Sequence, residues 1–224
     1  MPRSLRIALL TSLGLLAQAI AMAAPPQILQ IFREPLKPAS EAAYDAIEVE
    51  TARLAGQLGC PNPYLAAQTL SGSKEVWWFN AYSSPARQQE VFDAYANNTR
   101  LMDALRAMTA RKKSLTLAPI DLTTTYLPAL SSGNAWTLGE GRFLVVTVTT
   151  EQTHDTGTVF EAPDGTRFVV RAANTREQAE AVRKSSGPDT KVLAVRPSWS
   201  FPAKEWIAMD AVFWQQRSDP EIRP

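Results

Sequence analysis

The stretch EVWWFNAYSSPARQQEV, residues 75–91, joins an aromatic-rich strand pattern to a helix start, and the predicted fold is built outward from it. Its first eight residues hold two tryptophans, a phenylalanine, an asparagine and a tyrosine. Aromatic residues favour a pleated, half-buried strand. Ser84 then stands at a helix N-cap position and Pro85 at the first helical position, where proline is well tolerated. No other stretch of the sequence is as rich in side chains that could form a binding site.

Alternate residues of the expected strand point to opposite faces of a sheet. Trp77 and Phe79 share the more uniformly apolar face. We predict that this face packs under helices, because a buried asparagine would be costly there without hydrogen bonds. The opposite face carries Trp78, Asn80 and Tyr82, and we predict that it points into a small-molecule pocket. The alternative is that these side chains simply fill the enclosure.

Other strands could add polar groups to this predicted pocket. Gln68 joins the face of Trp78 if the turn at Ser71-Gly72-Ser73 separates the two strands by an odd number of residues. Gln30 or Arg33 of the first strand could also reach inward, although not both, since they lie on opposite faces. The ligand-pocket candidates are therefore Trp78, Asn80, Tyr82 and Gln68.

Residues 24–118 follow the order β-α-β-β-α-β. The long helical region after residue 84 is expected to break near Asn97-Asn98, and Gly59 closes the earlier helix. The expected elements are strands at 28–32, 64–70, 75–82 and 115–118 and helices at 40–58 and 84–113.

The pattern of the remaining residues predicts a second half of the fold. Residues 119–137 are rich in Thr, Ser and Pro, lack a clear period, and are predicted to form a connector. The segment 81–91 also resembles 172–182, since in each an apolar strand runs into a capped helix. For the half at 138–216 the expected elements are strands at 142–150, 158–162, 166–173, 191–195 and 205–214 and a helix at 176–185.

The hairpin-plus-helix YLAAQTLSGSKEVWWFNAYSSPARQQEVFDAYANN, followed by LMDALRAMTARKKSL, resembles the dimeric α+β barrel superfamily. It is most similar to NIPSNAP-type and antibiotic-biosynthesis-monooxygenase-like domains, in which a strand ending in W-x-x-Y-x-S enters a helix. Trp78, Tyr82 and Ser84 approximate this pattern, with three residues instead of two between the tryptophan and the tyrosine. The resemblance covers about residues 27–118.

This resemblance implies an α+β fold in which a ferredoxin-like sheet joins a second sheet to enclose a pocket. Two tandem halves in one chain could close a pseudo-dimeric barrel within a monomer, and a homodimer is the alternative. Members of the superfamily include cofactor-independent monooxygenases and haem-degrading enzymes. The latter use a histidine of the second helix as haem ligand, and residues 84–113 contain no histidine. We therefore expect no haem cofactor by that route.

The N-terminus predicts export. Residues 1–6 are basic, residues 7–20 are largely apolar, and Ala21-Met22-Ala23 supplies the small residues that a signal peptidase reads. The sequence thus predicts a signal peptide over 1–23, and a periplasmic or secreted protein. A membrane anchor is the alternative, but the apolar run is shorter than the roughly 20 residues of a spanning helix. We expect no membrane association after cleavage.

The net charge and the counts of cysteine and histidine argue against nucleic-acid binding and against a metal site. Without Arg3 and Arg6 the chain has 21 basic and 22 acidic residues, so no electrostatic argument favours nucleic acid. Cys60 and His154 are the only cysteine and histidine, and a Cys/His metal site is not expected. Cys60 is expected to be a structural thiol. His154 could act as a base beside Asp155, but we expect it to be a solvated loop residue without a catalytic role. Residues 217–224 form a polar tail.

The sequence thus predicts an exported small-molecule-binding α+β barrel protein for an aromatic or apolar ligand, with cofactor-independent oxygenase activity as a candidate extension. The alternative is a non-catalytic periplasmic interaction or structural protein with a filled barrel. No catalytic residue can be assigned.

Overall fold

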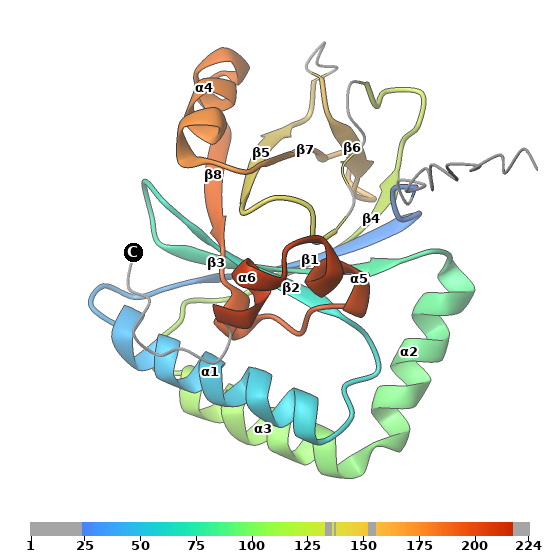
Figure 1. Cartoon of the computed structure of the whole chain (residues 1–224), viewed down its shortest axis with the longest axis vertical. Helices are drawn as coiled ribbons and strands as arrows, with labels where there is room; N and C mark the ends of the chain where they lie inside the picture. The colour runs from blue at the N-terminus through green and yellow to red at the C-terminus, as the bar shows by residue number, and fades with distance from the viewer. Residues whose placement is uncertain (1–23, 133–135, 137, 152–155, 217–224) are drawn as a thin grey trace, which may run out of the picture.

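The computed structural model describes residues 24–132, 136, 138–151 and 156–216 (Figure 1). The expected signal peptide, His154 and the tail at 217–224 lie outside the described residues. Eight antiparallel strands form a closed barrel. In order around the barrel they are β1 (Ile28–Pro35), β3 (Glu75–Tyr82), β2 (Tyr64–Thr69), β8 (Thr190–Val195), β5 (Phe143–Thr149), β7 (Arg167–Ala173), β6 (Thr158–Glu161) and β4 (Ile120–Tyr126).

The barrel is built from two halves with the same strand order. In the first half the order is β4-β1-β3-β2, and in the second it is β8-β5-β7-β6, so each half places its strands in the order fourth, first, third, second. Pairing of β2 with β8 and of β4 with β6 closes the barrel within one chain. This confirms the predicted α+β fold with two ferredoxin-like halves.

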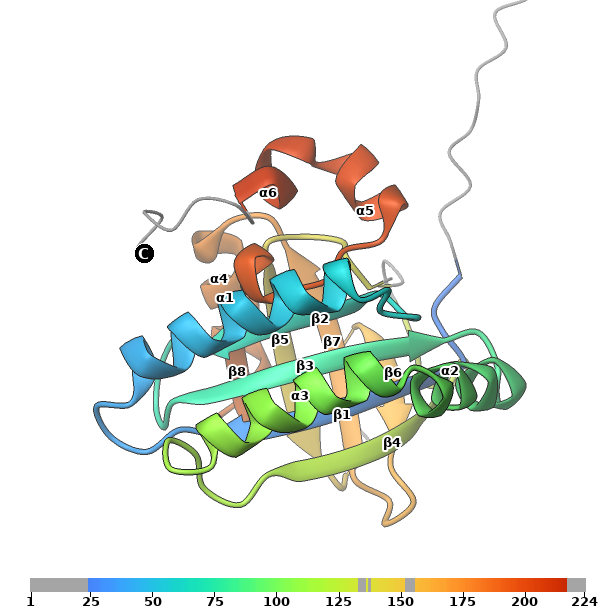
Figure 2. The same cartoon turned by 90° about the horizontal axis from the view of Figure 1, so that it is seen from below.

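The two halves differ in how helices cover them. On the outside of the first half, α1 (Glu41–Gln57) and α3 (Thr99–Lys112) lie side by side, and α2 (Pro85–Asn97) leads from β3 into α3 (Figures 1 and 2). The second half carries α4 (Arg176–Ser186) beside β8. Where the first half has α1, the second half connects β5 to β6 through residues 150–157.

The helix starts that the sequence predicted are formed. The Ser84 side chain accepts a hydrogen bond from the backbone N–H of Arg87 at the start of α2. Thr175 and Gln178 make a reciprocal capping box at the start of α4. These caps lie at equivalent places, after β3 and after β7, so the resemblance between 81–91 and 172–182 reflects the repeated topology. Asn98 separates α2 from α3 and caps α3, as the expected break requires.

Two predicted elements were wrong. The closing strand of the first half is β4 at Ile120–Tyr126, inside the expected connector, and not residues 115–118. In β4 the inward Leu122 and Tyr126 alternate with outward residues, and threonine, being β-branched, suits a strand. The expected strand at 205–214 is instead a pair of short helices, α5 (Lys204–Met209) and α6 (Ala211–Gln215).

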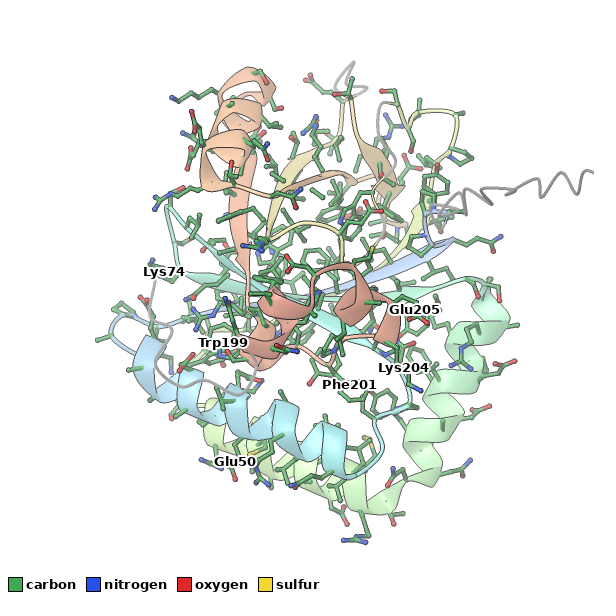
Figure 3. The ribbon with its side chains drawn as sticks, in the orientation of Figure 1. Glu50, Lys74, Trp199, Phe201, Lys204 and Glu205 are labelled. Carbon is green, nitrogen blue, oxygen red and sulfur yellow. The ribbon has the colours of Figure 1, made fainter. Side chains whose placement is uncertain are left out.

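The segment after β8 covers two parts of the molecule. The 3₁₀ turn η1 (Pro197–Trp199) packs between α1 and β2, and Figure 3 shows Trp199 and Phe201 on this segment. Farther along, α5 and α6 cross one end of the barrel (Figures 1 and 2). Trp206, Phe213 and Trp214 belong to the same apolar cluster as the inward strand residues, so these helices close that end.

Candidate functional site

The two faces of β3 are the reverse of the prediction. Trp77 packs against Phe168 of β7 with ring centroids 6.4 Å apart, and Phe79 belongs to the same cluster inside the barrel. Trp78 instead packs against Tyr64 at 5.7 Å, in the cluster between the sheet and the helices. The physical reason is that the barrel interior is enclosed by sheet on all sides and takes the face with the larger apolar part, Trp77 and Phe79, while Glu75 of the same face pairs with Arg33 at the end of the barrel. The helix side, in contrast, supplies polar partners.

The four predicted pocket residues do share one face, but it is the outer one. The Tyr82 hydroxyl donates to Gln30 Oε1 at 3.2 Å, and its ring contacts Phe92 of α2. The side-chain Oε1 of Gln68 accepts from Arg196 Nη1 at 3.0 Å. Asn80 pairs with Tyr64 of β2 on the same side. None of the four points into the barrel, whereas Arg33 of β1 does.

Trp78 lies over a buried polar network that the sequence did not reveal. Its indole N–H donates to Glu34 Oε2 at 3.0 Å, and the Tyr44 hydroxyl donates to the same oxygen. Lys112 of α3 donates to Glu34 at 3.0 Å and forms an ion pair with Glu48 of α1 at 2.6 Å. The network joins β1, β3, α1 and α3, and all five residues are at most 9% exposed.

Burial strongly perturbs the acid–base behaviour of this network. It raises the pKa of Glu48 to about 7, against the opposing effect of Lys112. It also raises the pKa of Tyr44, and the nearby carboxylates of Glu48 and Glu34 act in the same direction. Burial alone would lower the pKa of Lys112, but the same two carboxylates raise it. Since the network is sealed beneath the helices, it serves first to hold them on the sheet.

Side chains fill the interior of the barrel. The inward residues of the strands form one cluster, with buried members at 8% exposure or less. Phe79, Trp136 and Phe160 meet edge to face there, a favourable geometry for aromatic rings. The interior is therefore a packed core, as the alternative sequence interpretation held.

A cavity of about 680 Å³ lies instead at the end of the barrel closed by α5 and α6. We call it the capped-end cavity. The start of β5, the end of β7 and the two short helices surround it. It is open to solvent on one side, and polar and apolar groups contribute about equally to its wall. The lining residues are Trp136, Gly139, Glu140, Gly141, Arg142, Ala172, Asn174, Met209, Asp210, Phe213 and Trp214.

Two glycines shape the loop that forms one wall of the cavity. Gly139 has φ +92°, and a Cβ there would lie 2.3 Å from the ring of Trp206. Gly141 has φ +74°, and a Cβ there would lie 2.9 Å from the carbonyl oxygen of Ala173. Glycine therefore lets the loop approach both α5 and β7, which other residues could not do without strain.

Two charged residues of the cavity, Arg142 at the start of β5 and Asp210 between α5 and α6, hold each other in place. Arg142 donates to Asp210 Oδ2 from Nε at 3.0 Å and from Nη2 at 2.7 Å, and its guanidinium lies 5.3 Å from the ring centre of Phe213. Asp210 also accepts from the backbone N–H of Phe213. Burial would raise the pKa of Asp210, but the hydrogen bond from Arg142 lowers it. Asp210 is thus held ionised.

Few sequence patterns point to this cavity. Trp206 and Trp214 were read as strand residues, and Trp136 was placed in the connector. Their common feature is an aromatic side chain in segments without a clear period. The indole nitrogen of Trp136 is buried without a hydrogen-bond partner among the described residues. Such a buried donor without a partner costs free energy.

The described residues contain no cluster of three or more His, Cys, Asp or Glu side chains arranged to hold a metal ion. The half-buried Cys60 thiol contacts the Tyr95 hydroxyl at 3.1 Å. Within the same described ranges, no helix has both the length and the apolar character needed to cross a bilayer.

Three solved structures are similar to this chain at low identity. A proposed monooxygenase from Fusobacterium nucleatum has 11% identity and a TM-score of 0.49, over 81% of this chain and 94% of that one. A proposed monooxygenase from Lactobacillus acidophilus has 8% identity and a TM-score of 0.39, over 75% and 93%. A proposed chlorite dismutase has 7% identity and a TM-score of 0.39, over 76% and 95%. No protein-family model and no curated protein matches the sequence. The fold assignment therefore rests on the strand order itself.

Proposed function

We propose that this protein is an exported binding protein that holds a small, flat, largely apolar ligand in the capped-end cavity. One observation carries the proposal. The barrel interior is filled by side chains, whereas a cavity of about 680 Å³ remains where the short helices close the barrel. This volume falls within the roughly 300–1,000 Å³ of small-molecule sites.

The lining supports an aromatic ligand with one polar end. Trp136, Phe213 and Trp214 offer ring surfaces, and rings favour offset or edge contacts with another ring. Arg142 and Asn174 supply the hydrogen-bonding groups that would orient a carboxyl, carbonyl or hydroxyl group.

The same geometry favours binding over acid–base catalysis. Asp210, whose pKa is lowered, is a weak base near neutral pH and is already paired with Arg142. Oxygenase activity on the bound compound, the extension expected from the sequence resemblance, stays a separate proposal. Oxygen consumption by the ligand-loaded protein, measured with an oxygen electrode, would test it. A rate equal to that of the ligand alone would rule it out.

Export is part of the proposal and rests on the pattern of residues 1–23. We expect protein recovered from a bacterial periplasm to begin at Ala24. Intact-mass measurement decides this, because retention of residues 1–23 would instead support a membrane anchor.

The binding proposal can be tested with the six tryptophans of the chain as reporters. Native mass spectrometry of the exported protein would first show whether a compound is retained. The protein labelled with ¹⁵N at the indole nitrogens would then be titrated with 2-naphthoate, each signal being assigned by a Trp→Phe variant. We expect the signals of Trp136 and Trp214 to move, and that of Trp78 to stay.

A matched pair of variants separates binding from a general effect on folding. Ala172→Leu adds bulk to the wall of the cavity and should weaken 2-naphthoate binding about tenfold or more. Ala110→Leu adds the same atoms at an exposed position of α3 and should leave binding unchanged. Equal affinity in both variants, or the absence of any retained compound and any shift, would favour a structural protein with a filled barrel.

A further inference from the structure

The opposite end of the barrel carries a second cavity of different character. It has a volume of about 490 Å³ and lies where β1 ends, β8 begins and β2 turns into β3. We call it the basic mouth. Its lining residues are Arg33, Ser71, Gly72, Val148, Arg183, Pro188, Asp189, Thr190 and Lys191.

Three cations meet in this lining, and the carboxylates of Asp189, Glu75 and Glu180 line the site or pair with them. Arg33 comes from β1, Arg183 from α4 and Lys191 from β8, so the fold brings together three cations that are far apart in the sequence. Asp189 is the carboxylate among the described lining residues. Arg183 also pairs with Glu180 at 2.8 Å, at the outer side of α4.

Glu75 lies beneath Arg33 and Lys191, and its acceptor capacity is already used. Its Oε2 accepts from Arg33 Nη2 at 2.7 Å and from the Trp77 indole at 2.9 Å. Its Oε1 accepts from Lys191 and from Ser73, both at 3.2 Å. Glu75 therefore offsets one positive charge and orients both cations.

The cations keep donors for a ligand. Arg33 is held flat, with its guanidinium 4.4 Å from the ring centre of Trp77, and only its Nε and Nη2 bond to Glu75. Lys191 has three N–H donors and makes one such bond within the described part of the chain. The donors of Arg33 that do not face Glu75, held in a fixed plane beside the ammonium group of Lys191, match the oxygens of a carboxylate or phosphate group.

From this geometry we propose that the basic mouth binds a small oxyanion, a carboxylate or phosphate group, between Arg33, Lys191 and Arg183. This site is distinct from the capped-end cavity and does not depend on it. The barrel then offers an aromatic site at one end and an anion site at the other.

Titration with inorganic phosphate, and separately with acetate, at constant ionic strength tests the proposal. Trp77 is the reporter, because its indole N–H shares Glu75 with Arg33 and Lys191. We expect its ¹⁵N indole signal to shift with saturation, and those of Trp136 and Trp214 to stay. Tighter binding of phosphate would assign a phosphorylated ligand, and tighter binding of acetate a carboxylate.

Variants complete the test. Lys191→Met and Arg183→Met should each weaken the anion at least tenfold, whereas Lys184→Met, on an exposed position of the same helix, should not. Arg183→Met leaves the Glu75 cluster intact and keeps the test valid if Lys191→Met folds poorly. The proposal is overturned if neither anion shifts Trp77, or if all three variants bind alike.

Discussion

The two faces of β3 are both buried but are stabilised in different ways. The inward face, with Trp77 and Phe79, packs into an apolar interior in which aromatic rings meet. The outward face, with Trp78, meets a network of two carboxylates, a phenol and an ammonium group beneath the helices. The comparison shows that an aromatic strand can be core on both sides, with a buried charged network under the helices on one side and, on the other, a single charged cluster around Glu75 at the end of the strand.

The largest loss of stability is expected when the outward network loses its cation. Lys112→Met would leave Glu34 and Glu48 buried without a compensating charge. Breaking a buried pair in this way costs about 3–5 kcal/mol. Urea unfolding of the variant and the parent protein would measure it.

A neutralised network is the matched control for that variant. Adding Glu34→Gln and Glu48→Gln to Lys112→Met should restore a substantial part of the lost stability. If Lys112→Met alone unfolds at the same urea concentration as the parent, the network contributes nothing and the comparison fails.

The inward face should respond to the loss of one ring. Phe79→Ala removes a fully buried side chain from the barrel interior and should cost roughly 4 kcal/mol. Phe92→Ala, at an exposed position of α2, provides the control and should cost well below half of this. A small effect of Phe79→Ala would mean that side chains do not fill the barrel interior, which would contradict the packed core described above.

The outward face should also make stability depend on pH. The pKa of Glu48 is raised by burial from 4.5 to about 7, so the folded protein holds this proton more firmly than the unfolded chain. The resulting stabilisation is complete below about pH 4.5 and is lost as the pH rises to about 7, by up to about 3 kcal/mol. Unfolding curves at several pH values would show the loss, and Glu48→Gln should remove it.

The smallest effect is expected at Asn80, which shares the outward face but lies beyond the charged network. Asn80→Ala should change stability by about 0.5 kcal/mol or less, because the side chain is half-buried and solvent can replace its contacts. Thermal melts would compare Asn80→Ala with Trp78→Ala, and we expect Asn80→Ala to lower the melting temperature less. Equal losses would place Asn80 in the network after all.

Local patterns were enough to predict most of the fold. The capped helix starts at Ser84 and Thr175 and the break at Asn98 could be predicted because side chains adjacent in sequence form them. The strand at 120–126 could not, because its threonines do not alternate clearly in hydrophobicity. Trp206 and Trp214 were mistaken for strand residues, since short helices owe their place to contacts with the barrel.

The candidate site was harder to predict, for a geometric reason. Strand periodicity groups Trp78, Asn80 and Tyr82 on one face but does not say which face is inside. That choice depended on Glu34, Glu48 and Lys112, which satisfy the polar groups under the helices and come from three distant segments. The capped-end cavity likewise forms only when the chain after β8 folds back over the barrel.

A crystal structure of the mature protein with 2-naphthoate tests the central claim most directly. The claim is that the interior is packed and that the ligand site lies at the end closed by α5 and α6. The account predicts density for the naphthyl ring between the loop at 139–142 and these helices, near Trp214 and Arg142. Density among Trp77, Phe79 and Phe168 inside the barrel, or beside Trp78 under α1, would contradict it.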